Sequence, residues 1–239
     1  MQLSDLDSAK NLVELFLKRA DERGDKPFLG AKRGGTWQTI SWAEAARQVC
    51  LLAENLNALG LHEGDRVMLV SENRPEWCIA DLAIMAAGLV TVPTYTTNTE
   101  RDHAHILDNS GARAVIVSTE KLSVPLIPAI FRTGMAEHVI PMDGIRQYQG
   151  GNLQCHAWSG MLEGDATVAR AAVDARIAGI QRDRTACIIY TSGTGGAPRG
   201  VLQHHGMILC NVAGAAEVLL NDFGIDEEER FLSFLPLSH

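Results

Sequence analysis

The feature that most constrains the fold is the regular alternation of short apolar runs with longer segments of helical length. Residues 75–87 form one such helical segment, which Pro75 suits at its first turn. Runs that are apolar throughout are typical of strands in a sheet covered on both faces, and strand–helix alternation supplies the crossover connections of parallel strands. We therefore predict an α/β fold with a mainly parallel β-sheet flanked by helices, whose first strands are 66–70, 89–93, 114–117 and 138–142.

Capping signals mark the helices that precede this sheet. Asn11 with Glu14 predicts a helix over 12–21, and Ser41 with Glu44 predicts a second helix whose apolar stripe runs to Leu59. Thr99 and Asp102 begin a helix that ends before Gly111. We also predict a short strand over 36–40 and helices over 126–132 and 166–180.

Composition changes within the chain predict two subdomains. Residues 1–184 form an N-terminal α/β subdomain, in which 143–165 is a long irregular connection rich in glycine and polar residues. Residues 185–239 begin a second α/β subdomain with a strand over 186–190. A further strand is predicted over 231–235, and because the chain stops directly after it we expect truncation at His239.

Charge, cysteine content and hydropathy exclude several classes of protein. There are 21 Lys and Arg against 29 Asp and Glu, a net charge of −8, so we expect no nucleic-acid partner. The five cysteines include no CxxC pair, so we expect neither a disulfide framework nor a zinc site. The longest apolar stretch, 79–92, contains Asp81 and is too short to cross a bilayer. No signal peptide is evident, and we expect a cytoplasmic protein.

The most informative segment is Tyr190-Thr-Ser-Gly-Thr-Gly-Gly-Ala-Pro-Arg-Gly-Val201, which follows a predicted strand. We call residues 191–200 the phosphate loop. A helical pattern with apolar residues at 208, 212, 215 and 219 is predicted to follow it. Its glycines let the backbone approach a ligand, its hydroxyl groups donate hydrogen bonds, and Arg199 supplies a permanent positive charge suited to phosphate. The alternative is a flexible surface loop, which the order of strand, hydroxyls, glycines and cation disfavours.

Two well-known nucleotide-binding motifs do not fit this segment. Gly195 and Gly200 have the glycine spacing of a Walker A motif, but Val201 and Leu202 stand where that motif requires Lys and Ser or Thr. The dinucleotide-binding fingerprint fails because Pro198 replaces its third glycine.

The segment resembles the phosphate loop of the adenylate-forming (AMP-binding) superfamily, whose pattern is Y-T-S-G-T-T-G-x-P-K-G-V. Gly195 replaces a Thr of the pattern and Arg199 replaces its Lys. Residues 64–67, 71–77, 92–99 and 234–239 resemble further blocks of long-chain fatty acid–CoA ligases, in the same order. The resemblance implies the N-terminal portion of such an enzyme, and part of the large N-terminal domain of an acyl-CoA synthetase as its fold.

The resemblance implies a reaction in two halves, with ATP, Mg²⁺ and coenzyme A as cofactors of the intact enzyme. A fatty acid carboxylate is first joined to AMP with release of pyrophosphate, and the thiol of coenzyme A then takes the acyl group. The implied phosphate-binding residues are Thr191, Ser192, Gly193, Thr194, Gly195, Gly196 and Arg199. His239 is implied beside the acyl pocket, and we assign no catalytic residue and no metal ligand to this chain.

Other functions stay open at this stage. They are a non-enzymatic nucleotide- or pyrophosphate-binding domain on the same scaffold, an aryl-acid or amino-acid adenylating enzyme, and an α/β domain without a ligand. For the ligase, the resemblance implies that the adenine-binding segment and a late Lys belong to a missing C-terminal part. We therefore expect the 239-residue chain to be inactive alone. A long-chain acid substrate also makes peripheral contact of the full-length enzyme with the inner face of a membrane plausible.

Overall fold

A parallel β-sheet organises the computed structural model, which describes residues 3–146, 152–191, 197–221, 223–224 and 230–238. Its strand order is β7-β6-β5-β3-β4-β8-β9, and all neighbours are parallel except β8 and β9, which form an antiparallel pair. The strands are β3 (Arg66–Val70), β4 (Val90–Thr94), β5 (Ala114–Val117), β6 (His138–Pro141), β7 (Gln154–Cys155), β8 (Thr185–Thr191) and β9 (Arg199–His204).

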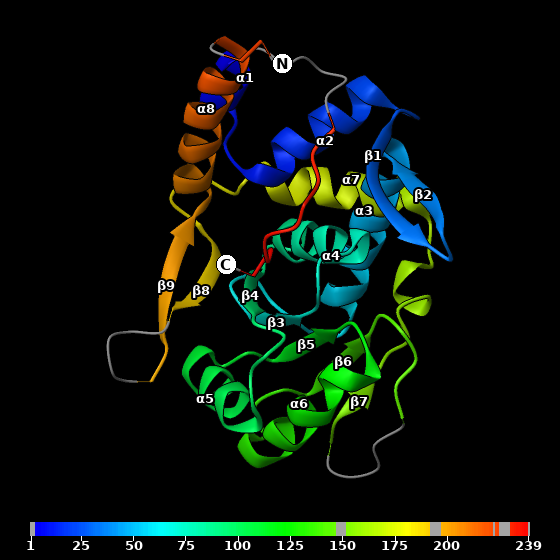
Figure 1. Cartoon of the computed structure of the whole chain (residues 1–239), viewed down its shortest axis with the longest axis vertical. Helices are drawn as coiled ribbons and strands as arrows, with labels where there is room; N and C mark the ends of the chain where they lie inside the picture. The colour runs from blue at the N-terminus through cyan, green and yellow to red at the C-terminus, as the bar shows by residue number, and fades with distance from the viewer. Residues whose placement is uncertain (1–2, 147–151, 192–196, 222, 225–229, 239) are drawn as a thin grey trace.

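Helices cover the two faces of this sheet, as Figure 1 shows. One face carries α2 (Leu12–Arg23), α3 (Trp42–Ala58), α4 (Pro75–Ala86) and α7 (Ala166–Ile177). The other face carries α5 (Glu100–Ser110) and α6 (Glu120–Thr133). The helices α1 (Leu3–Ser8) and α8 (His205–Asn221) contact each other at one end of the molecule. The predicted fold class is confirmed.

Two apolar cores follow from the alternation of side chains along each strand. Val67 and Leu69 of β3 pack against the face that carries α3 and α4, whereas Met68 and Val70 pack against the face that carries α5 and α6. All four side chains are fully buried. Burial of a large apolar side chain contributes roughly 1.5–3 kcal/mol, so the two cores together stabilise the central strands.

The predicted caps form at the helix ends. Glu14 donates its backbone N–H to Asn11 Oδ1 at 2.8 Å, and Glu44 donates to Ser41 Oγ at 3.1 Å. Thr99 and Asp102 form a complete capping box at α5. The sequence analysis missed β1 (Pro27–Arg33), which pairs with β2 (Thr36–Ser41) in a separate two-stranded hairpin. This hairpin packs beside α3, where Trp42 stacks on Phe28 with ring centroids 3.8 Å apart.

The helix predicted after the phosphate loop is confirmed as α8, which contains residues 208, 212, 215 and 219. Strand β9 precedes this helix and was not predicted. Residues 231–235 were predicted as a strand, yet they have no ladder partner among the described residues. The reason is that strand-forming composition yields a strand only where a neighbouring strand supplies hydrogen bonds.

The region 143–165 is largely irregular over its described residues and contributes β7 and a short 3-10 turn (Gly160–Leu162). β8 joins β4 in the sheet of the first subdomain. The division between residues 184 and 185 stays a prediction. None of the described helices combines the length and the hydrophobicity needed to span a bilayer.

Candidate nucleotide-binding site

The two described ends of the phosphate loop lie at one end of the β8–β9 hairpin. Thr191, the last residue of β8, pairs with Arg199, the first residue of β9. Because β8 runs parallel to β4, its carboxyl end lies at the same edge of the sheet as the carboxyl ends of the other parallel strands. Open α/β sheets bind their ligands at this edge. The fold therefore places the two described ends of the loop where a ligand is expected.

Helix α5 holds the hairpin at the end that carries the phosphate loop. Tyr190 is buried and donates its hydroxyl to Asn109 Oδ1 at 2.6 Å. Burial raises the pKa of this tyrosine, so its hydroxyl keeps its proton at neutral pH. His105, one helical turn before Asn109, lies with Nε2 2.8 Å from the carbonyl oxygen of Pro198. A carbonyl can only accept, so His105 donates from Nε2. Together the two side chains anchor both strands that flank the loop.

Gly200 is required by packing inside the hairpin. A Cβ atom at this position would lie 2.7 Å from Ile188 Cγ2 and 3.1 Å from Tyr190 Cζ. Both distances are shorter than the usual 3.5–4.0 Å contact between carbon atoms, taken as an approximate range. The sequence analysis attributed the glycines of the loop to ligand approach, and for Gly200 the structure adds this close contact between strands.

Thr191 and Arg199 lie at the two described ends of the loop, and both are exposed. Arg199 forms no ion pair with any carboxylate in the described part of the chain, so its guanidinium is available to an anionic ligand. The structure thus brings these two predicted residues together. Ser192, Gly193, Thr194, Gly195, Gly196 and His239 lie outside the described residues, and their predicted roles stay predictions.

A polar network occupies the remainder of this edge, after strands β3, β5 and β6. Arg74 donates two hydrogen bonds to Asp143, both at 3.1 Å, and a third to Glu76 at 2.8 Å. Burial works to raise the pKa of Glu76, but hydrogen bonds from Arg74 and Arg33 outweigh it and hold that pKa below its usual value. Arg74 is thus paired with carboxylates of the chain itself.

Asn73 connects this edge to the last described segment. Its side-chain amide donates to the carbonyl oxygen of Leu235 at 2.6 Å and to that of Ser233 at 3.2 Å, and its Oδ1 accepts from the backbone N–H of Leu237 at 3.0 Å. Residues 71–77 and 234–239, which carried parts of the resemblance, are therefore in contact.

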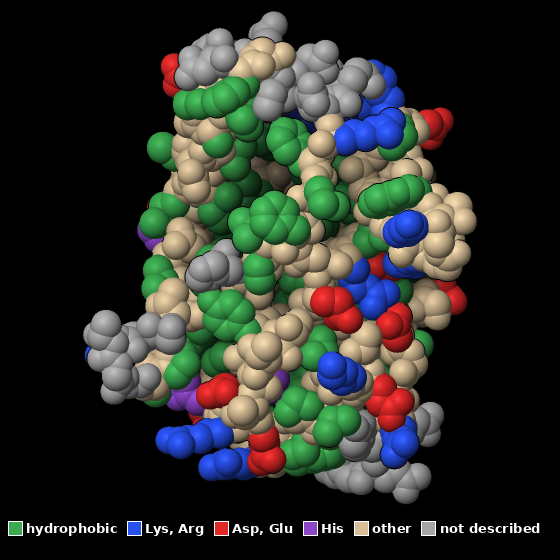
Figure 2. Space-filling view, viewed as in Figure 1, with side chains coloured by type: hydrophobic (Ala, Val, Ile, Leu, Met, Phe, Trp, Pro, Cys, Tyr) green, Lys and Arg blue, Asp and Glu red, His purple; other side chains and the backbone are tan. Residues whose placement is uncertain are grey.

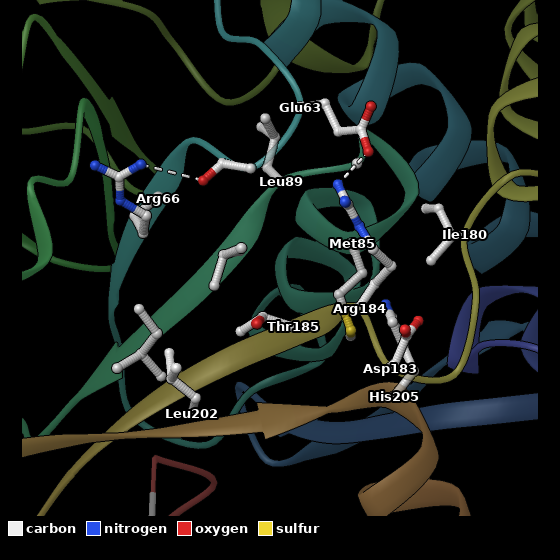
Figure 3. Close-up of a pocket in the computed structure, with 14 residues that line it drawn as sticks. Glu63, Arg66, Met85, Leu89, Ile180, Asp183, Arg184, Thr185, Leu202 and His205 are labelled. Atoms are coloured by element: carbon white, nitrogen blue, oxygen red, sulfur yellow. Dashed lines mark hydrogen bonds and ion pairs between the residues drawn. The ribbon is translucent and has the colours of Figure 1, made fainter.

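A cavity of about 490 Å³ lies at the opposite, amino-terminal edge of the sheet (Figure 3). Glu63 and Arg184 form an ion pair beside it, and Arg66 turns away to bond backbone carbonyl oxygens, including that of Ser110 at 2.6 Å. His205 also lines the cavity, and burial lowers the pKa of its ring to about 4. Because the cavity lies at the far end of the strands from the phosphate loop, we do not assign it to the nucleotide.

The described residues contain no group of three or more His, Cys, Asp or Glu side chains placed to hold one ion. His103 is fully buried, whereas the neighbouring His105 bonds the hairpin, so the two histidines do not act as a pair. All five cysteines are free.

Sequence reasoning missed His105 and Asn109 as supports of the loop. The available signal was weak: two polar residues four apart on a helix share one face. Only the tertiary fold shows that this face meets Tyr190 and Pro198.

Comparison with known proteins gives the family. Residues 16–239 match the AMP-binding enzyme family. The long-chain-fatty-acid–CoA ligase FadD15 of Mycobacterium tuberculosis is 33% identical over 220 residues, which cover 91% of this chain and 35% of the relative. The long-chain-fatty-acid–CoA ligase ACSBG2 of Xenopus laevis is 26% identical, and the match covers 33% of its length. The chain thus spans about a third of the length of these curated relatives.

Solved structures share the fold. The A-PCP didomain of the carboxylic acid reductase from Segniliparus rugosus, solved in complex with AMP, superposes with a TM-score of 0.74 at 17% identity, covering 99% of this chain and 37% of that one. The anthranilate CoA ligase AuaEII, solved with anthranoyl-AMP, superposes with a TM-score of 0.65 at 23% identity, covering 86% and 36%. With its matched residues running from the first core helix through the phosphate loop, this chain belongs to the AMP-binding enzyme family.

Proposed function

We propose that this chain forms the N-terminal part of an ATP-dependent long-chain fatty acid–CoA ligase. The observation that carries the proposal is the phosphate loop on an anchored hairpin at the carboxyl edge of the sheet, in a chain 33% identical to a ligase of this kind. The expected substrate partitions into membranes. We therefore place the whole protein in the cytoplasm with peripheral contact with the inner face of a membrane.

The role of this chain in that reaction is to hold the phosphates of ATP. ATP supplies the AMP group that activates the fatty acid carboxylate, and pyrophosphate leaves. Arg199 offers a fixed positive charge to the β- and γ-phosphates, and the hydroxyl and backbone groups of 191–196 donate to their oxygens. Stabilising the departing pyrophosphate in this way lowers the barrier, since phosphate chemistry depends mainly on positioning and charge.

Tyr190, Asn109 and His105 are positioning residues in this scheme. They bond Tyr190 and Pro198, so the two described ends of the loop are held in place before ATP binds. Preorganised donors stabilise developing charge without the cost of rearrangement. Coenzyme A, the acceptor in the second half-reaction, and Mg²⁺ follow from the family resemblance, and no residue described here is assigned to them.

Titration calorimetry tests the phosphate-binding role. We expect the 239-residue chain to bind ATP and pyrophosphate, Arg199→Ala to weaken both, and Arg199→Lys to retain most of the affinity because it keeps the charge. Equal affinity for ATP and pyrophosphate in the wild type and in Arg199→Ala would mean that Arg199 does not bind the phosphates. We also expect no pyrophosphate release when the chain alone meets ATP and a fatty acid, which a coupled pyrophosphate assay measures.

The ligase assignment itself needs the rest of an enzyme. We would fuse this chain to the part of FadD15 that follows the matched region and supply ATP, a long-chain fatty acid and coenzyme A. Formation of the acyl thioester supports the assignment. A fused protein that binds ATP but forms no thioester supports a nucleotide-binding domain instead.

A further inference from the structure

Two histidines face each other at one end of the sheet. His138 begins β6, and His156 directly follows β7, which lies beside β6 as the last strand on that side (Figure 1). His138 Nδ1 lies 3.1 Å from His156 Nε2, and the centroids of the two rings are 5.2 Å apart. Neither ring has a role in the proposed ligase function, so the pair needs an explanation of its own.

Strand pairing brings the two rings together. Gln154 donates its backbone N–H to the carbonyl oxygen of Glu137 at 2.8 Å, and His156 donates to that of Val139 at 2.9 Å. His138 stands opposite Gln154 in the parallel ladder. Because side chains alternate along a strand, the side chains of His138, Gln154 and His156 lie on one face, and that of Cys155 lies on the other. The backbone therefore holds the two imidazoles in place.

Both rings are in the neutral form that can bind a metal. His138 is 4% exposed, and His156 is half-buried. Burial lowers the pKa of both rings, and the charge of Glu137 and a hydrogen bond to the backbone of Leu59 do not outweigh it at His138. Each ring therefore carries one N–H and one nitrogen lone pair at pH 7.5.

The charged groups near the pair offset one another. Arg113 donates to Glu137 at 3.0 Å and to Asp65 at 2.8 Å. Figure 2 shows acidic and basic side chains interspersed over this end of the molecule, on the face that it draws. A cation that approaches across this face does not meet a purely basic surface.

The separation of the two nitrogens suits a transition-metal ion. Imidazole nitrogens lie about 2.0–2.1 Å from zinc, so two of them on one ion are about 2.9 Å apart at a right angle and about 3.4 Å apart at the tetrahedral angle. The observed 3.1 Å lies between these values. It also allows one ring to donate its N–H to the other. An ion can replace that shared proton once the proton moves to the other nitrogen of its ring.

We propose that His138 and His156 together chelate a divalent transition-metal ion such as Zn²⁺, with water completing the coordination. Nitrogen ligands favour Zn²⁺, Ni²⁺ and Cu²⁺ over Mg²⁺ and Ca²⁺, which prefer oxygen. The site is therefore distinct from the Mg²⁺ implied for the ligase reaction, and it does not depend on the proposed function. The lack of CxxC pairs, from which we expected no zinc site, does not bear on a site made of imidazoles.

The ion would fasten a weakly held edge of the sheet. β7 has only two residues, and His156 leads from it into the largely irregular residues 157–165. An ion bound to both histidines joins this connection to β6. Since the two ligands meet only in the folded chain, the free energy of metal binding adds to the stability of the fold.

Titration calorimetry of the 239-residue chain with Zn²⁺ at pH 7.5 tests the site, and Mg²⁺ is the negative probe. We expect one high-affinity Zn²⁺ per chain, bound about tenfold or more weakly in His156→Ala and in His138→Gln, because each variant loses one of two protein ligands. Gln154→Ala and Cys155→Ser in β7 are the matched controls and should keep the wild-type affinity. Zn²⁺ should also slow amide hydrogen exchange at 152–156 in the wild type and not in His156→Ala.

The amides of β3, β4 and β5 report in the exchange experiment whether each variant is folded, and if His138→Gln does not fold, His156→Ala decides alone. A wild-type chain that binds no Zn²⁺, or binds it no more tightly than folded His156→Ala or His138→Gln, overturns the proposal and leaves the pair as a hydrogen bond. Loss of Zn²⁺ binding in Cys155→Ser would bring the thiol into the site and overturn the two-histidine assignment.

Discussion

Replacing Gly200 with Ala tests whether packing within the hairpin governs the conformation of the phosphate loop. The added methyl group would lie 2.7 Å from Ile188 Cγ2, nearly 1 Å too close, and 3.1 Å from Tyr190 Cζ. Tyr190 cannot easily move away, because it is buried and its hydroxyl is bonded to Asn109. The strands at the base of the loop must therefore separate.

The expected cost follows from two opposing effects. Overpacking of this kind destabilises a protein by about 1–3 kcal/mol. The alanine also restricts the unfolded chain more than glycine does, which stabilises the folded state by about 0.4–1 kcal/mol. We therefore expect Gly200→Ala to lower the free energy of unfolding by about 1–2 kcal/mol, which for a chain of this length lowers Tm by roughly 2–8 °C.

Urea denaturation followed by circular dichroism measures this change. Gly214→Ala in α8 is the matched control, because an added Cβ there meets no atom within 4 Å. That control should be neutral or stabilise the chain by up to about 1 kcal/mol. ATP affinity should fall in Gly200→Ala and stay unchanged in Gly214→Ala. A Gly200→Ala chain as stable as the wild type would refute the reasoning from the close contact.

Four further predictions concern pH, the loop and the last segment. Burial lowers the pKa of His103 and of His205 to about 4, so as the pH falls the unfolded chain takes up these protons before the folded chain does. The free energy of unfolding should therefore fall between about pH 6.5 and 4, by roughly 3 kcal/mol for each histidine. His205→Asn should make this dependence on pH less steep, which urea titrations at a series of pH values measure. Burial raises the pKa of Asp81 to about 6, so ionisation of its carboxyl group lowers the stability of the folded chain as the pH rises from about 4 through 6. Asp81→Asn should stabilise the chain by about 1–3 kcal/mol at pH 7.5 and have little effect below pH 4. An equal effect at both pH values would count against burial as the cause. Gly195→Thr restores a hydroxyl of the family pattern and should tighten ATP binding by roughly 0.5–1.5 kcal/mol in calorimetry, and unchanged or weaker affinity would contradict the assigned role. Asn73→Ala removes the bonds to residues 233–237, so their amides should exchange faster while those of β3 do not change.

Strands that are apolar throughout could be predicted from the sequence, because burial on both faces leaves a run without polar residues. β3 and β5 are of this kind, and their predicted bounds agree with the structure to the residue. β1 and β9 were missed, since Gly30 and Gly200 interrupt them and both carry exposed polar residues. Such strands exist because a partner pairs with them, and pairing is a property of the whole fold.

The candidate site also has one part that the sequence predicts and another part that depends on the tertiary fold. The types and order of residues in the phosphate loop predict a phosphate ligand, because that chemistry is local, and this stays a prediction. The supports of the loop were not predictable, since His105 and Pro198 are 93 residues apart and meet only in the folded chain. Residues 231–235 were predicted as a strand from composition, and the described residues hold them through Asn73 without a strand partner.

The sheet order also has a kinetic consequence. β3, β4, β5 and β6 are joined by short crossovers within residues 66–141, so their contacts are comparatively local. β8 instead pairs with β4 across 96 residues, Thr91 opposite Cys187, and it carries β9 with it. Contacts between distant residues must wait for a large loss of chain entropy. We expect the hairpin that bears the phosphate loop to dock last during refolding, so the nucleotide-binding edge is completed only after the rest of the sheet has formed.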